Sequence, residues 1–135
     1  MDNTEIPVKI KVKTTIDRQE SFELLTFGRY FQKGEATFLK YEEVQEEGTV
    51  RTIVKLAGNE ALILRGGAVK MRLPFELNRV LRGSYEMPFG VFETMTLAKR
   101  IEQTEGRIEI LYDFTIQGEP AGTYHLEITF QEERK

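Results

Sequence analysis

The sequence predicts an all-β fold, a single antiparallel up-and-down β-barrel that spans residues 1–135. Apolar and polar residues alternate with a period of two in segment after segment, which is typical of strands with one buried face. Short turn sequences separate these segments at intervals of about ten residues. The connections are too short for the crossovers that parallel strands need. We expect about nine or ten strands, and a closed barrel rather than a two-sheet sandwich, because closure removes the sheet edges.

Four strands are expected in the first half of the chain, at residues 6–16, 21–31, 35–45 and 50–57. In the first of these, isoleucine and valine alternate with Lys9, Lys11 and Lys13, so one face is apolar and the other is expected to face solvent. Gly28 lies inside the second strand. A glycine at such a position predicts a bend or bulge of the kind that barrel closure requires.

Six more strands are expected, at residues 61–64, 68–75, 80–87, 91–101, 107–116 and 123–130. Pro74 has no backbone donor and therefore indicates a sheet edge or a strand end. Gly83 predicts a second bend. A helix over residues 96–103 is the alternative for part of this region, because Leu97 and Ile101 stand four residues apart among good helix formers.

Composition excludes several classes of function. The chain has no Cys, no Trp and a single His, which rules out disulfides, a Cys nucleophile and any Cys-ligated metal site. The formal net charge of -3 argues against bulk electrostatic binding of nucleic acid or a membrane. No apolar run approaches the ~20 residues of a membrane span, and the polar N-terminal residues do not resemble a signal peptide. We expect a cytoplasmic protein without a cofactor or a membrane partner, either a monomer or a homodimer.

The order of several short motifs resembles that of a known family. The motifs are the lysine-rich first strand, Tyr41-Glu42-Glu43, Arg65-Gly66-Gly67, the sequence from Tyr85 to Gly90, and the final paired strands with Tyr112 and Gly122. In order and spacing they resemble the YwiB-like proteins, small uncharacterised bacterial proteins mostly from Firmicutes, over nearly the whole chain. One departure is Met87, which stands where we expect a Thr before the Pro-Phe-Gly turn. The resemblance implies a calycin-type, lipocalin-like barrel and no established activity.

His125 is the obvious candidate for acid–base catalysis, since histidine is the side chain that most often fills that role. Its neighbours Tyr124 and Leu126 belong to an apolar face, which puts His125 with Glu127 on the solvated face. A surface histidine is therefore the favoured interpretation. No serine lies in a nucleophile motif, and the Gly-Gly turn is not followed by the helix of a phosphate-binding loop. We expect no catalytic residue and no metal site, and we interpret the acidic turn at Glu46 as a solvated hairpin end.

Two sets of residues could bind a ligand. Between residues 65 and 82, five basic side chains stand against a single acidic one, Glu76, which gives a local net charge of +4. Arginine suits carboxylate and phosphate groups. Five tyrosines and nine phenylalanines would line a barrel with apolar surface that carries hydroxyls. Charge pairing with Glu-rich strands and a core filled by side chains are the alternatives left open. The candidate ligand-binding residues are Arg65, Arg72, Arg82, Tyr30, Tyr85, Tyr112 and Tyr124.

The leading functional hypothesis is a non-enzymatic barrel that binds a small, mostly apolar ligand, neutral or anionic, in its interior. The alternative is an interaction module that holds an acidic protein or RNA on the basic surface of segment 65–82. An enzyme that works with Glu, Tyr, Arg and Lys is a third hypothesis, but no pair of catalytic residues stands out. Exposed Phe or Leu side chains on the outer barrel face would indicate a dimer.

Overall fold

Ten strands account for nearly all of the chain. The structure is a computed structural model that describes residues 4–133. The strands are β1 (Ile6–Ile16), β2 (Glu20–Lys33), β3 (Ala36–Gln45), β4 (Gly48–Ala57), β5 (Glu60–Gly67), β6 (Lys70–Glu76), β7 (Val80–Met87), β8 (Gly90–Thr104), β9 (Arg107–Ile116) and β10 (Glu119–Glu132). Within the described range, no helix is long and apolar enough to cross a membrane.

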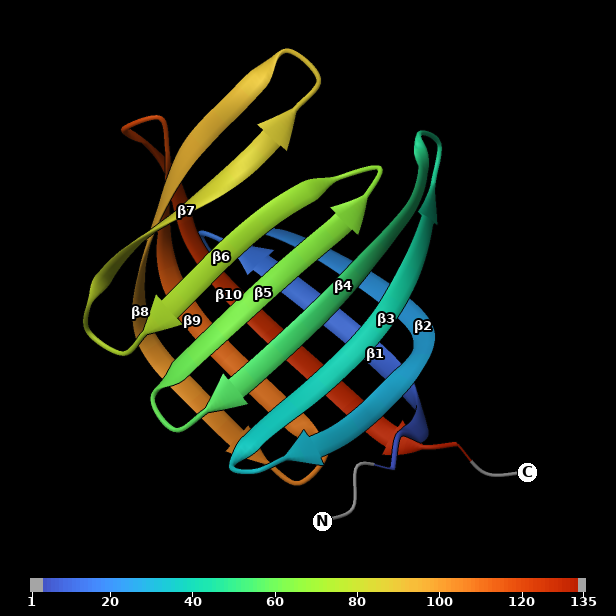
Figure 1. Cartoon of the computed structure of the whole chain (residues 1–135). Helices are drawn as coiled ribbons and strands as arrows, with labels where there is room; N and C mark the ends of the chain where they lie inside the picture. The colour runs from blue at the N-terminus through green and yellow to red at the C-terminus, as the bar shows by residue number, and fades with distance from the viewer. Residues whose placement is uncertain (1–3, 134–135) are drawn as a thin grey trace.

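The strands form a closed antiparallel barrel (Figure 1). Each strand pairs with the next along the chain, and β1 pairs with β10 to close the ring. The predicted fold class is therefore confirmed, including the preference for a barrel over a sandwich. Five hairpin turns gather at one end, and we call it the open end: they are β1–β2, β3–β4, β5–β6, β7–β8 and β9–β10. The opposite end is called the closed end.

The alternative of a helix over residues 96–103 is wrong. This segment belongs to β8, which continues as a strand to Thr104 with an irregularity between Ala98 and Arg100. Pairing with β9 along nearly its whole length explains the result, because tertiary contacts override a weak helix propensity. The bulge shifts the alternation, so that Ile101 packs against the core after Ala98.

The hydrophobic core fills the closed half of the barrel. Ile10, Leu39, Ile108, Ile110 and Ile128 have no exposed surface. They stand on β1, β3, β9 and β10, and in β1 and β10 they lie on the apolar face that the sequence predicts. In this half, inward-facing side chains occupy the interior, as is common in small barrels.

Two glycines mark the places where neighbouring strands part. A side-chain carbon at Gly28 would overlap the carbonyl oxygen of Lys40, and one at Gly83 would overlap that of Arg72. The β2–β3 ladder ends at Gly28, and the β6–β7 ladder ends one residue from Gly83. Both positions need glycine because another backbone approaches closely.

Pro74 lies where β6 loses its partner β7. The β6–β7 ladder covers Lys70 to Arg72 only, so Pro74 needs no donor on that side. Its carbonyl oxygen instead accepts a hydrogen bond from the Thr96 hydroxyl at 2.5 Å. The edge position that the proline predicted is confirmed.

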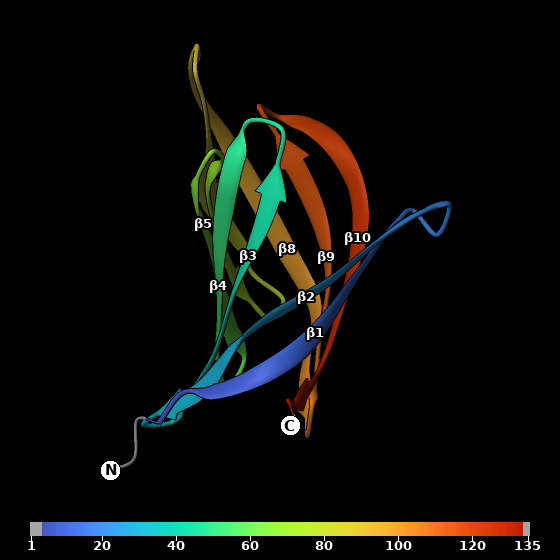
Figure 2. The same ribbon diagram turned by 90° about the vertical axis from the view of Figure 1, so that its right-hand side faces the viewer.

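The barrel wall is interrupted between β2 and β3 at the open end. β2 pairs with β1 from Glu20 to Tyr30, but with β3 only from Gly28 to Lys33. Figure 2 shows the β1–β2 hairpin leaning away from the β3–β4 hairpin. The Thr26 hydroxyl donates to the carbonyl oxygen of Glu42 at 3.0 Å and bridges the start of the gap. Among the residues that the structure describes, no strand lies beside the remaining edge of β2 on its β3 side.

Candidate functional site

A row of inward-facing side chains runs around half of the barrel at its open end. Strand register places neighbours of this row directly opposite one another on successive strands. The row consists of Tyr41, Thr52, Arg65, Met71, Tyr85 and Phe92. Its members alternate with outward-facing residues, and they share their strand faces with the buried Leu39, Val54 and Leu73.

Arg65 is the cation in the middle of this row. Its guanidinium lies 3.4 Å from the carboxylate of Glu43, and both side chains are partly buried, with 27% and 28% exposed. On the other side, burial raises the pKa of the Tyr41 hydroxyl, and this outweighs the opposing effects of the Arg65 charge and the hydrogen bond with Thr52. Tyr41 therefore keeps its proton at neutral pH and can donate a hydrogen bond beside the Arg65 charge.

Tyr85, Tyr112 and Tyr124 also face the interior. Tyr85 belongs to the row itself, two strands from Arg65. Tyr112 and Tyr124 stack with ring centroids 5.5 Å apart, and Tyr112 meets Phe75 edge-on at 4.7 Å. Burial raises the pKa of Tyr112 strongly. Tyr112 is thus part of the packed core, whereas Tyr124 and Tyr85 keep partial exposure toward the open end.

Tyr30 lies at the closed end, away from the other predicted residues. Its ring stacks on Phe130 at 5.1 Å. The two rings border a hollow of about 820 Å³, whose polar lining includes Gln32 and Gln103. The structure therefore does not bring Tyr30 together with Arg65.

Arg72 and Arg82 stand on the outer wall. Arg72 lies opposite Leu64 and Ser84 in the sheet, on the face opposite to Arg65. Arg82 is 76% exposed and lies 3.9 Å from the carboxylate of Glu93. Neither arginine can reach a ligand held inside the barrel. The basic segment 65–82 is thus divided between the two faces of the sheet, with Arg65 on the inner face and Lys70, Arg72 and Arg82 on the outer face.

Thr94 is a polar residue of the interior that sequence reasoning missed. It has no exposed surface, and its hydroxyl finds no hydrogen-bond partner among the described protein groups. Thr94 stands opposite Gly83 on β7. On β8 it is two residues from Phe92, a member of the row. A buried hydroxyl without a partner costs about 1–3 kcal/mol, so a native structure that retains one calls for an explanation. The Thr-rich alternation of residues 92–98 is the only sequence signal for it.

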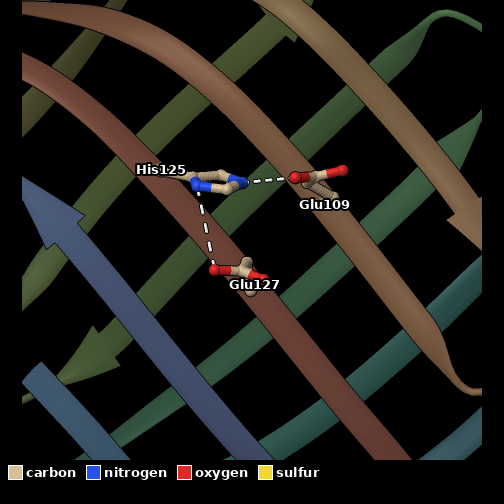
Figure 3. Close-up of side chains that lie close together, drawn as sticks. All are labelled: Glu109, His125 and Glu127. Carbon is tan, nitrogen blue, oxygen red and sulfur yellow. Dashed lines mark hydrogen bonds and ion pairs between the residues drawn. The ribbon is translucent and has the colours of Figure 1, made fainter. Parts of the chain in front are cut away.

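The outer wall carries an ionic cluster formed by β9 and β10 (Figure 3). His125 points outward, as its position in the alternation predicted, and its Nε2 makes a short hydrogen bond with the carboxylate of Glu109. Its Nδ1 lies 3.7 Å from Glu127. Arg107 spans the two carboxylates, 2.9 Å from Glu127 and 3.4 Å from Glu109. The sequence indicated the orientation of His125 but not this clustering, which depends on the β9–β10 register.

Glu109 is the most deeply covered charged group of this cluster, with only 8% of its side chain exposed. Burial acts to raise the pKa of Glu109, but hydrogen bonds from His125 and Arg107 and the charge of Arg107 outweigh it and hold this pKa below its ordinary value. Ligand atoms of Glu109, His125 and Glu127 lie within 4.8 Å of one another, a spacing that a metal ion could bridge. Because Arg107 contacts both carboxylates and Arg100 lies 3.6 Å from that of Glu109, we assign the cluster as a set of ion pairs that joins the strands.

A hollow of about 500 Å³ lies beside this cluster and is lined by Arg18, Lys99 and Arg100. Lys99 pairs with Asp113 at 3.2 Å, and Arg100 lies 3.6 Å from the Glu109 carboxylate. Carboxylates of the protein pair with these two cations, and the third, Arg18, is exposed to solvent, so among the described residues the hollow offers an anionic ligand no partly buried cation such as Arg65. The open end of the barrel is therefore the better candidate for a binding site.

These observations define a class: a closed ten-stranded antiparallel barrel with a filled closed half and an arginine directed inward at its open end. The chain belongs to the family described as Domain of unknown function (DUF1934), whose model matches residues 8–128.

Two comparisons support this assignment. The chain is 35% identical over 134 residues, 94% of each chain, to the uncharacterized beta-barrel protein YwiB of Bacillus subtilis (strain 168). The crystal structure of the ywiB protein from Bacillus subtilis superposes with a TM-score of 0.81 and 30% identity, covering 96% of this chain and 94% of that one. The resemblance to the YwiB-like proteins is thus confirmed. The wider grouping with calycins stays a prediction.

Proposed function

We propose that this protein is a non-enzymatic, cytoplasmic binding protein that holds a small, mostly apolar anion in the open half of its barrel. The observation that carries the proposal is the position of Arg65, a partly buried cation that faces inward between Tyr41 and Tyr85. A buried or half-buried arginine is the side chain best suited to receive a carboxylate or phosphate in a planar, two-pronged contact. The absence of cysteine is compatible with a reducing compartment.

The open half brings space and a cation together, whereas the larger hollow at the closed end has no arginine among the described residues of its lining. A hollow of about 480 Å³ lies beside the gap between β2 and β3, and Tyr41 and Thr52 form part of its lining. The inward-facing row combines the apolar Met71 and Phe92 with the polar Tyr41, Thr52 and Arg65. Small-molecule sites have this composition, mostly apolar walls with a few polar groups that fix the orientation.

The side chains of the row have different roles in the proposed binding site. The contact of Arg65 with Glu43, at 3.4 Å, holds the guanidinium in place, and within the described part of the chain its other donors have no acceptor and can serve a ligand anion. The Tyr41 hydroxyl adds a neutral donor next to the charge. Met71 and Phe92 provide apolar surface for the rest of the molecule. No group needs to transfer a proton or form a bond, so the arrangement supports binding and not catalysis.

The experiment compares two arginines of the same hairpin. Arg65→Gln removes the inward cation, and Arg72→Gln is the matched control on the outer wall. The probe is anilinonaphthalene sulfonate, an apolar anion whose fluorescence rises on binding. Loss of a charge-assisted hydrogen bond of about 1.5–3 kcal/mol predicts affinity weakened about 10- to 100-fold for Arg65→Gln, with no change for Arg72→Gln.

Two results would contradict the proposal. One is an equal loss of affinity in both variants, which would place the probe on the outer wall. The other is a wild-type protein that binds no anionic probe and carries no small molecule in native mass spectrometry after gentle purification. Salt-dependent RNA binding that Arg72→Glu and Arg82→Glu abolish together would support the alternative, an interaction module on the outer wall.

A further inference from the structure

The free edge of β2 at the open end is the most unusual feature of the barrel wall. From Glu20 to Leu25 this strand is fully paired with β1 but has no neighbour on the β3 side within the described part of the chain. Closed barrels abolish such edges, and proteins that keep them usually shield them with lysine, proline or a bulge. Residues 20–25 contain no lysine or proline, and Glu20 and Glu23 are their charged residues. The β1–β2 register runs through them without a shift.

Large apolar side chains are exposed on both faces of this edge. Phe22 is 57% exposed on the inner face, and Leu25 and Phe27 are 67% and 61% exposed on the outer face. Across the gap, Val44 on β3 is 85% exposed. Apolar groups gathered in this way along an unpaired strand mark a surface that another chain covers.

The charges around the gap between β2 and β3 indicate which kind of polypeptide would bind there. Carboxylates border it on both sides, from Glu20 and Glu23 on β2 to Glu42 on β3 and Glu46 and Glu47 in the β3–β4 turn. Among the described residues, two of the five have a basic partner: Glu23 lies 3.7 Å from Lys11, and Glu42 lies 3.8 Å from Arg51. Lys9, Lys11 and Lys13 stand beside β2 on the outer face of β1, whereas the unpaired carboxylate of Glu20 is on the opposite, inner face. A second copy of this chain would bring two acidic edges together, which like-charge repulsion disfavours. A partner with basic side chains is attracted by the same carboxylates.

We propose that the edge of β2 from Glu20 to Leu25 accepts an extended segment of another protein, in which large apolar residues alternate with Lys or Arg. The segment adds a strand to the sheet through backbone hydrogen bonds, as in other cases of strand addition. Its apolar side chains cover Leu25 and Val44 on the outer face, and its basic side chains lie on the inner face, where Glu20 carries an unpaired carboxylate. This interaction is independent of the anion site at Arg65.

The test uses three short fluorescent peptides and measures their binding by anisotropy. The first alternates valine and lysine, the second alternates valine and glutamate, and the third is the lysine peptide with proline in place of its central valines. We expect the lysine peptide to bind at least about tenfold more tightly than the glutamate peptide, a difference of about 1.4 kcal/mol or more. The proline peptide has the same charge but cannot form a strand, so it should bind as weakly as the glutamate peptide.

Charge-reversal variants locate the site. Glu20→Lys combined with Glu23→Lys should weaken binding of the lysine peptide at least about tenfold and improve binding of the glutamate peptide. The matched control is Glu86→Lys combined with Glu93→Lys, which makes the same charge change on β7 and β8 and likewise breaks one surface ion pair, Glu93 with Arg82. The control should leave binding unchanged.

Three results would overturn the proposal. Equal binding of the proline peptide would show that only bulk charge attracts the lysine peptide. Equal loss of binding in the control variant would place the contact elsewhere. A concentration-dependent dimer in sedimentation experiments, with slow hydrogen exchange of β2 amides in the absence of peptide, would show that a second copy covers the edge.

Discussion

At the residue scale, Glu109 shows how packing determines the behaviour of a charged group. Hydrogen bonds from His125 and Arg107 hold the pKa of Glu109 below its ordinary value despite burial. A group whose pKa is lower in the folded state stabilises the fold at pH values above its unfolded pKa. That stabilisation is lost as the pH falls through the lower, folded value. The ionic cluster should therefore stabilise the barrel at neutral pH and weaken in acid.

We predict that Glu109→Gln lowers the free energy of unfolding by about 1–3 kcal/mol at neutral pH. The loss should shrink in acid, because the wild-type carboxylate is then protonated as well. Urea unfolding at a series of pH values measures this, and Glu93→Gln, an exposed carboxylate, serves as the control. A loss that stays constant from neutral to acidic pH would show that the charge of Glu109 contributes nothing.

Two buried threonines of β8 provide a second test at this scale. The Thr96 hydroxyl donates to the carbonyl oxygen of Pro74, whereas the Thr94 hydroxyl has no protein partner. We predict that Thr96→Val lowers the free energy of unfolding by about 1 kcal/mol, while Thr94→Val leaves it unchanged or raises it by a similar amount. Thermal and urea unfolding of the two variants measure the difference. An equal loss in both would mean that the Thr94 hydroxyl is satisfied in solution.

At the element scale, the glycine bends control where the strands of the barrel part. A methyl group at Gly28 would meet the backbone of Lys40, which cannot give way, whereas at Gly66 nothing lies within 4 Å. We predict that Gly28→Ala lowers the free energy of unfolding by about 1–3 kcal/mol, as overpacking does elsewhere. Gly66→Ala should have an effect of no more than about 0.5 kcal/mol. Equal effects in urea unfolding would contradict the close approach of β2 and β3.

The strands themselves were predictable, and their inward faces mostly so. Where alternate residues of a strand are apolar and the residues between them are charged, as with the lysines of β1, the pattern identifies the buried face directly. In β8 both parities carry apolar residues: Val91 is 63% exposed, while Thr94 is buried. Sequence alone could not choose between them, because the choice depends on register with β9. The mistaken alternative of a helix in this strand has the same origin.

At the scale of the whole molecule, the sequence could predict that the barrel closes, but not that a gap separates β2 from β3 at the open end. Ten strands joined by tight turns leave few alternatives to an up-and-down barrel. Whether β2 and β3 stay paired to their tips depends on the crossing at Gly28 and not on local pattern. The division of segment 65–82 between inner and outer faces also follows from hairpin register. It leaves Arg65 inside and Arg72 outside, which composition could not show.

The central claim, that Arg65 receives an anion inside the barrel, has a direct spectroscopic test. Nitrogen NMR follows the Nε–H resonances of the arginine side chains while anilinonaphthalene sulfonate is added. We predict a saturable shift of the Arg65 resonance, with the resonances of Arg72 and Arg82 unmoved because those side chains lie on the outer wall. Shifts confined to Arg72 or Arg82, or no arginine shift while the probe binds, would contradict the assignment of the open half of the barrel as an anion site.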